Sequence, residues 1–276
     1  MSRKENFMNT TIEKLPKKTY KLKITVEKDV VDKAFEHALG HFAREMQVEG
    51  FRQGKAPMNI VEEKVDRGRL NGEVVNSLIP SHYSAALREH KINPITSPKV
   101  EINQFEKGKE FIFTATAVEK PNINLGDYKK SLKSLETKDK KPTVEDIVNK
   151  ILETVQIEIP QLLIDEEITN MFSSLIDQTA RLGITIEDYL KSQNKTVEAL
   201  RAEYSKIAEY NLRADLLLNE IADVEKIQVS DEEIQKTIQA APDEETRKAL
   251  SNENQKWYIK SILRKNKVIQ NLINYE

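Results

Sequence analysis

The sequence predicts an α+β domain, in which helices cover one face of an antiparallel sheet, followed by an all-α domain. Two observations lead to this fold class. Up to about residue 120 the segments have the order strand, strand, helices, strand, strand, which is typical of an α+β domain. From residue 143 onward, apolar residues recur at helical spacing to the end. We therefore expect domains at 1–125 and 143–276, joined by a lysine-rich linker or arm at 126–142.

Four strands are predicted in the first domain. Residues 9–28 form two of them, joined near Pro16. The second strand has apolar residues at alternate positions, which predicts one buried and one exposed face: Tyr20, Leu22, Ile24 and Val26. Strand character returns at 99–103 and 110–119, with the hairpin turn at 107–108.

Three helices are predicted between the two pairs of strands. Asp29 is suited to cap the first, which carries an apolar stripe at helical spacing: Val31, Phe35, Ala38, Leu39, Phe42 and Met46. Gly50 stands where a C-terminal glycine of this helix belongs, and Pro57 opens the second helix. The third helix runs from about 70 to 90, and Pro80 should kink it or mark a break in it.

The second domain shows several helix starts. Thr143 is suited to cap one helix, and Pro160 begins a longer one. The segments 185–188 and 230–233 both have the pattern of a capping box. These signals, together with the apolar spacing, predict helices throughout residues 143–276.

The composition indicates a protein with a heavily solvated surface. Charged residues make up 32% and hydrophobic residues 38% of the 276 positions. The net charge of −2 argues against a general nucleic-acid binder, which would usually be strongly basic. Residues 1–120 nevertheless carry 21 Lys and Arg against 17 Asp and Glu, whereas the remainder carries 22 against 28. The basic first part allows, without requiring, contact with RNA phosphate.

Several classes of function find little support in the sequence. It has no cysteine, which excludes disulfides, thiolate nucleophiles and cysteine-ligated zinc. It shows no apolar run of membrane-spanning length and no apolar segment of a signal peptide. We therefore expect a cytoplasmic protein without membrane contact.

Evidence for catalysis is equally scarce. His37 and His41 are four residues apart and could share a helix face, but the residues between them lack the glutamate of a zincin motif. Two solvated histidines are the interpretation that we favour. The sequence contains neither a phosphate-binding Walker loop nor a dinucleotide-binding glycine fingerprint. We expect no catalytic residues, no metal and no cofactor.

The most informative segment is Gly50–Pro57, which reads G-F-R-Q-G-K-A-P. It places Phe51, Arg52 and Lys55 on a loop bracketed by glycines, which have no side chains to cover an aromatic ring. Phe51 could enter an apolar crevice of a partner while the two cations pair with phosphate or carboxylate. The alternative is an ordinary turn between helices, with Phe51 folded back onto its own domain.

The segment resembles the ribosome-docking signature G-F-R-x-G-K-x-P of trigger factor, a family of bacterial chaperones for nascent chains. Every fixed position agrees, and the similarity extends along residues 10–125. The resemblance implies a docking tip beside the polypeptide exit tunnel, in contact with ribosomal protein and rRNA. Its residues would be Gly50, Phe51, Arg52, Gln53, Gly54, Lys55 and Pro57. Gln53 stands where some members carry a further docking lysine, so we expect one contact fewer.

The second half is similar to the helical, substrate-cradling C-terminal domain of the same family. Three segments carry this looser similarity: Ile157–Ile168, Leu200–Glu203 and Ile227–Ile234. The resemblance implies binding of unfolded or nascent polypeptides through modest apolar patches. Candidate contacts are Met171, Phe172, Leu175, Tyr204, Tyr210, Trp257 and Tyr258. For each of them, packing in the helical core is the alternative.

Trigger factors normally carry an FKBP-like prolyl isomerase domain between these halves, on the order of 100 residues long. Here only about 20 residues separate Leu135 from Val155. We therefore interpret the chain as a short form without the isomerase, and predict an ATP-independent holding chaperone that is not an enzyme. Two alternatives stay open: a ribosome-associated factor that binds one specific partner, and a chaperone with residual isomerase activity. A homodimer off the ribosome is a further expectation from the resemblance.

Overall fold

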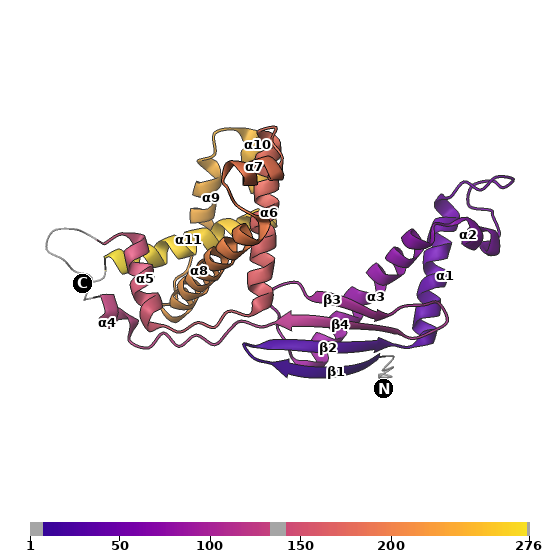
Figure 1. Cartoon of the computed structure of the whole chain (residues 1–276), viewed down its shortest axis with the longest axis horizontal. Coiled ribbons are helices and arrows are strands. Elements are labelled where there is room, and N and C mark those ends of the chain that lie inside the picture. The colour runs from indigo at the N-terminus through magenta and orange to yellow at the C-terminus, as the bar shows by residue number, and fades with distance from the viewer. Residues whose placement is uncertain (1–7, 133–141, 275–276) are drawn as a thin grey trace. The chain divides into compact units, whose positions relative to one another are not determined.

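The computed structural model describes residues 8–132 and 142–274 (Figure 1). These residues fall into two compact units, with the division between Lys120 and Pro121. Unit 1 contains an antiparallel sheet with helices, and unit 2 is helical. The predicted fold class is therefore confirmed, whereas the predicted domain limits stay a prediction.

Unit 1 is built on a four-stranded sheet with the strand order β1-β2-β4-β3. Its strands are β1 (Met8–Leu15), β2 (Thr19–Val26), β3 (Lys99–Gln104) and β4 (Phe111–Val118). The register pairs Leu22 with Ala115 and Ile24 with Phe113, so the apolar residues of β2 and β4 share one face. All four side chains are fully buried, as their alternation predicts.

Three helices pack on that face: α1 (Lys28–Glu45), α2 (Met58–Lys64) and α3 (Arg67–His90). Apolar side chains of all three join those of β2 and β4 in one core, among them Val31, Phe35, Phe42, Val61, Leu70 and Val74. The predicted cap of α1 is wrong. The N-cap is Glu27, and Asp29 lies in the first turn, where its charge suits the positive end of the helix. Helix α3 contains Pro80 and continues past it to His90, so Pro80 does not break the helix, and the kink stays a prediction.

Unit 2 consists of helices within its described part: α4 (Tyr128–Leu132), α5 (Val144–Thr154), α6 (Gln161–Arg181), α7 (Ile186–Ser192), α8 (Val197–Val224), α9 (Asp231–Gln239), α10 (Glu244–Leu250) and α11 (Glu253–Ile273). The predicted capping box at Ser230 is present, and Thr143 begins α5 with another. Thr185 caps α7 by accepting a hydrogen bond from the backbone N–H of Asp188 at 3.1 Å. These caps satisfy N–H groups that have no partner inside the helix.

The structure differs from the predicted linker in its first part. Residues 128–132 form α4, and the side chains of Tyr128 and Leu132 are buried. The Tyr128 hydroxyl donates to Glu225 at 2.9 Å, and Lys129 Nζ lies 2.7 Å from the same carboxylate. This part of the segment is therefore attached to the C-terminal end of α8. The remaining residues, 133–141, lie outside the described residues.

Candidate functional site

The connection between α1 and α2 is formed by residues 46–57 and projects away from the sheet of unit 1 (Figure 1). It contains two successive turns. The backbone N–H of Phe51 donates to the carbonyl of Val48 at 3.1 Å, and that of Lys55 donates to the carbonyl of Arg52 at 2.9 Å. Phe51 and Arg52 therefore stand at the junction, as the last residue of one turn and the first of the next. We call residues 48–55 the double turn.

The glycines of the signature occupy equivalent places in the double turn. Gly50 is the third residue of the first turn with φ +85°, and Gly54 is the third residue of the second with φ +77°. A positive φ at this place is the requirement of a type II turn, and glycine meets it without steric cost. Gly50 is thus not the C-terminal glycine of α1 that the sequence suggested. Helix α1 ends with Met46 as its C-cap, in an extended conformation.

The side chains at the junction face solvent. Phe51 is 39% exposed, and Arg52 and Lys55 are exposed as well. Within the described part of the chain, neither cation forms an ion pair with a carboxylate. Val48, only 3% exposed, and Ala56, which packs on the core, anchor the loop on either side. The double turn therefore presents part of one aromatic ring and two cations to solvent on an anchored base.

Gln53 has a structural role that the sequence did not reveal. Its side-chain amide Nε2 donates to the backbone carbonyl of Glu45 at 3.1 Å. That carbonyl belongs to the last turn of α1, where helical partners run out. Gln53 therefore ties the double turn to the end of the helix before it.

Sequence reasoning missed one neighbour of the signature. Met58, the first residue of α2, is 49% exposed. Its methyl group lies close to Gly40 of α1, at 3.6 Å from the position that a Cβ would take there. The signal that could have revealed it is its place directly after Pro57, in the first turn of a helix that begins on an exposed loop. Met58 adds a flexible apolar side chain beside the double turn.

Within unit 2, the candidate client contacts separate into two groups. Leu175, 7% exposed, packs with Leu190 and Leu200, and Phe172 and Tyr204 lie against this cluster. The two rings are 5.1 Å apart. Met171 is half-buried on the same helix. For Leu175 in particular, the structure shows the core position that was the alternative.

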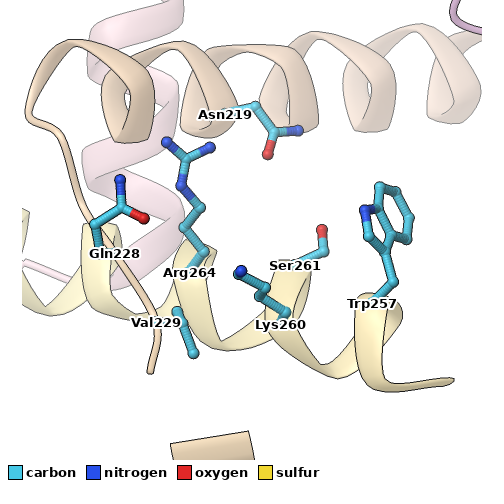
Figure 2. A pocket seen from close by; sticks show the side chains of 7 residues that line it. All are labelled: Asn219, Gln228, Val229, Trp257, Lys260, Ser261 and Arg264. Atoms are coloured by element: carbon cyan, nitrogen blue, oxygen red, sulfur yellow. The ribbon is translucent and has the colours of Figure 1, made fainter. Parts of the chain in front are cut away.

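The other group is exposed. Tyr210 is 38% exposed, Tyr258 57% and Trp257 72%. Trp257 borders two hollows. The first, of about 260 Å³, lies between α8 and α11 (Figure 2), and the second, of about 670 Å³, lies between α9 and α11. Apolar residues that sequence reasoning had not singled out as contacts are also exposed: Ile176, Leu182, Ile184, Val224 and Ile262.

His41 of α1 lies beside two glutamate side chains. His41 Nδ1 lies 3.3 Å from Glu73, and its Nε2 lies 3.6 Å from Glu45. Among residues 8–132 and 142–274, no cluster of three or more His, Asp or Glu side chains is arranged to hold a metal ion. No helix in these same ranges has the length and apolar character needed to cross a bilayer.

Two family models match this chain. A family model described as bacterial trigger factor protein matches residues 8–155, and a second, for the C-terminus of the same protein, matches residues 127–274. The chain belongs to the trigger factor family. The two matches overlap at 127–155, and the 276-residue chain lacks the isomerase domain between them.

Individual trigger factors agree with this assignment. The trigger factor of Desulforamulus reducens is 43% identical over 122 residues, and that of Clostridium kluyveri is 38% identical over 122 residues. Each alignment covers 44% of this chain and 28% of the relative, so the chain matches well under half the length of these relatives. A solved structure of a trigger factor chaperone superposes with a TM-score of 0.63 at 13% identity, covering 96% of this chain and 100% of the other. That likeness shows a shared fold.

Proposed function

We propose that this protein is an ATP-independent chaperone that docks at the ribosomal exit tunnel and shields nascent polypeptides. The observation that carries this proposal is the double turn. It presents Phe51 at 39% exposure beside two cations that have no carboxylate partner in the described residues. The chain belongs to the trigger factor family, and the resemblance of this loop to the family's signature makes ribosome docking its expected role.

Two kinds of interaction would contribute to docking, apolar burial and ion pairing. An apolar crevice of a ribosomal protein would remove the exposed part of Phe51 from water. Arg52 and Lys55 would pair with rRNA phosphate or with carboxylates, and the planar guanidinium of Arg52 suits bidentate contacts. Gln53 is engaged with the carbonyl of Glu45, which fits a docking set one contact smaller than in members with a lysine there.

Unit 2 would hold the client. Its exposed apolar side chains, Tyr210, Trp257 and Tyr258 among them, would each bind weakly, and many such contacts along one chain would sum to useful affinity. A similarly folded trigger factor chaperone is described for promiscuous substrate recognition in folding and assembly, which is consistent with contacts of this kind. We further propose a cytoplasmic location, no isomerase activity and, off the ribosome, a homodimer.

Ribosome co-sedimentation tests the docking. The wild-type chain is expected to pellet with ribosomes, and the Phe51→Ala/Arg52→Ala double variant to stay in the supernatant. Equal binding of the two proteins would sink the docking proposal. Circular dichroism melting of both proteins serves as the control, because two exposed side chains should contribute little to stability.

Two assays address the alternatives. If unit 2 serves one specific partner rather than many clients, the chain should fail to delay aggregation of several unrelated unfolded proteins. If an isomerase activity is present, the chain should accelerate a refolding reaction that is limited by prolyl isomerisation. We expect delayed aggregation and no acceleration.

A further inference from the structure

We call the two hollows beside Trp257 the groove. Trp257 and Lys260 stand one helical turn apart on α11 and line both hollows, the smaller of which is shown in Figure 2. We propose that the groove binds an extended polypeptide segment in which an apolar side chain packs on Trp257 and a carboxylate two residues away pairs with Lys260. This inference rests on the client-binding function proposed above.

Trp257 provides the apolar surface. At 72% exposure it is among the most exposed large apolar side chains of the described residues, and among those residues its ring has no aromatic partner. Leaving a tryptophan in water forgoes the free energy of burying one of the largest apolar surfaces that a side chain has. The hollows on its two sides provide room for a second side chain to lie against the ring.

Lys260 provides an uncompensated positive charge. The other cations of α11 near the groove each have a carboxylate partner: Lys256 with Glu253 at 2.8 Å, Arg264 with Asp223 at 2.8 Å, Lys265 with Asp215 at 2.5 Å and Lys267 with Glu233 at 2.7 Å. In the part of the chain that the structure describes, Lys260 has none. A carboxylate brought in by a ligand would therefore meet a free ammonium group rather than displace an internal partner.

Asp231 also lines the larger hollow and, among the described residues, forms no ion pair with a cation. Asp231 is the first residue of α9, so the partial positive charge of that helix end stabilises its carboxylate. Asp231 thus lies where a helix end favours a negative charge, whereas Lys260 lies in the interior of α11, away from either helix end.

The spacing of the two side chains fits an extended ligand. Residues three apart on a helix have Cβ atoms roughly 5–6 Å apart. Residues two apart in an extended chain lie on the same face at roughly 7 Å. A segment with an apolar residue at one position and an acidic residue two positions later can therefore meet Trp257 and Lys260 together.

Neutral polar groups in the smaller hollow suit the backbone of such a segment. Asn219, Gln228 and Ser261 line it together with Trp257 (Figure 2). The side-chain nitrogen of Asn219 donates to Asp215 at 2.9 Å, and among residues 8–132 and 142–274 its side-chain oxygen accepts no hydrogen bond. Hydrogen bonds to a peptide backbone do not depend on the ligand's side chains, so the groove would be tolerant of sequence outside the apolar–acidic pair.

The expected preference of the groove for an acidic residue in the bound segment distinguishes this proposal from general client binding. Residues 121–276 carry 22 Lys and Arg against 28 Asp and Glu, so the overall field of unit 2 favours basic clients. A local preference for an acidic residue next to an apolar one runs against that field, and can arise only from a specific contact.

The test uses the full chain and two short fluorescein-labelled peptides in a Gly-Ser background. One carries a Phe and, two residues later, an Asp, and the other has Lys in place of the Asp. Binding is followed by peptide anisotropy and by the emission of Trp257, which is the one tryptophan of the sequence. We expect the Asp peptide to bind about two- to fivefold more tightly than the Lys peptide and to shift the emission to shorter wavelength.

Matched variants separate the contacts. Trp257→Ala should weaken binding of the Asp peptide about tenfold, whereas Gln255→Ala, at an exposed position of α11 outside both hollows, should leave that affinity unchanged. Lys260→Glu should reverse the preference between the two peptides. Melting curves of the three variants should match that of the wild type, since these side chains are exposed.

The outcomes keep the two proposals apart. If the wild-type chain binds neither the peptides nor an unfolded protein such as reduced, carboxymethylated lactalbumin, the client-binding function itself fails. If the chain binds the unfolded protein, three results would overturn the inference: equal affinity for the two peptides, an unchanged preference in Lys260→Glu, or equal effects of Trp257→Ala and Gln255→Ala.

Discussion

Replacing Phe51 with Ala gives the sharpest test of how the double turn works. A phenylalanine side chain has roughly 200 Å² of surface to bury, and 39% of Phe51 is exposed. Enclosing that remainder removes about 80 Å² from water, which is worth about 2 kcal/mol at about 25 cal/mol per Å². The Phe51→Ala variant should therefore bind ribosomes about 30-fold more weakly than the wild type.

The assay is a titration of fluorescently labelled chain with ribosomes at two salt concentrations. The loss caused by Phe51→Ala should be the same at both, because burial of apolar surface does not depend on screening. Arg52→Ala and Lys55→Ala should instead reduce the salt dependence, because each removes a cation that releases counterions on binding. Ile102→Ala is the matched control, since Ile102 is 52% exposed on β3 of the same unit but outside the double turn.

Two results would refute this reasoning. One is a loss of less than about threefold for Phe51→Ala, which corresponds to under about 0.7 kcal/mol and leaves no room for burial of the ring. The other is an equal loss for Ile102→Ala, which would indicate a general effect on unit 1.

Three further predictions concern stability and loop geometry. Gly54→Ala should weaken ribosome binding by forcing a side chain into a left-handed conformation, at a cost of about 1–2 kcal/mol, whereas an unchanged affinity would show that the turn can relax. Glu119 accepts hydrogen bonds from a backbone N–H at 2.9 Å and from the Tyr20 hydroxyl at 2.8 Å, which lower its pKa in the folded chain. The stabilisation by this carboxylate is therefore fully present above the unfolded pKa of about 4.3 and is lost as the pH falls through the lower folded pKa. In urea unfolding, the free energies of unfolding of Glu119→Gln and wild type should differ at neutral pH and converge at acid pH. Tyr128→Phe removes the bond to Glu225 and should destabilise unit 2 by about 1 kcal/mol in the same assay; no change would mean that water replaces the hydroxyl.

The strands and long helices were predictable because their patterns depend on the chain alone. Alternation in β2 and β4 specifies which side chains reach the core, and the structure buries Ile24 and Phe113 accordingly. Capping residues such as Thr143 and Ser230 act within three residues of themselves, so they too can be recognised locally. The error at Gly50 has the same origin. The glycine after a helix end and the third residue of a type II turn both take a positive φ, so the residue type alone does not distinguish the two.

The candidate client contacts were less predictable, because the spacing of apolar residues on a helix does not reveal which neighbouring helix covers each face. Leu175 and Trp257 both belong to helical apolar patterns, yet the first is 7% and the second 72% exposed. Packing of α6 with α7 and α8 covers Leu175, and this depends on contacts between residues distant in sequence. The sequence did not reveal that Lys260 lacks a carboxylate partner, for the same reason. Three of the four carboxylates that pair with the other cations of α11 lie on α8 or α9, so the pairing depends on how the helices pack.

The double turn also bears on the kinetics of docking. Each of its turns is closed by a backbone hydrogen bond, and Gln53 ties it to Glu45. Ordering a flexible residue on contact costs about 1–2 kcal/mol, so even two such residues would cancel the burial of Phe51. A loop already held in one conformation avoids that loss and can associate as a rigid body, at a rate limited mainly by orientation. If the proposed contact is confined to the double turn, the complex would also dissociate readily, because few side chains would hold it.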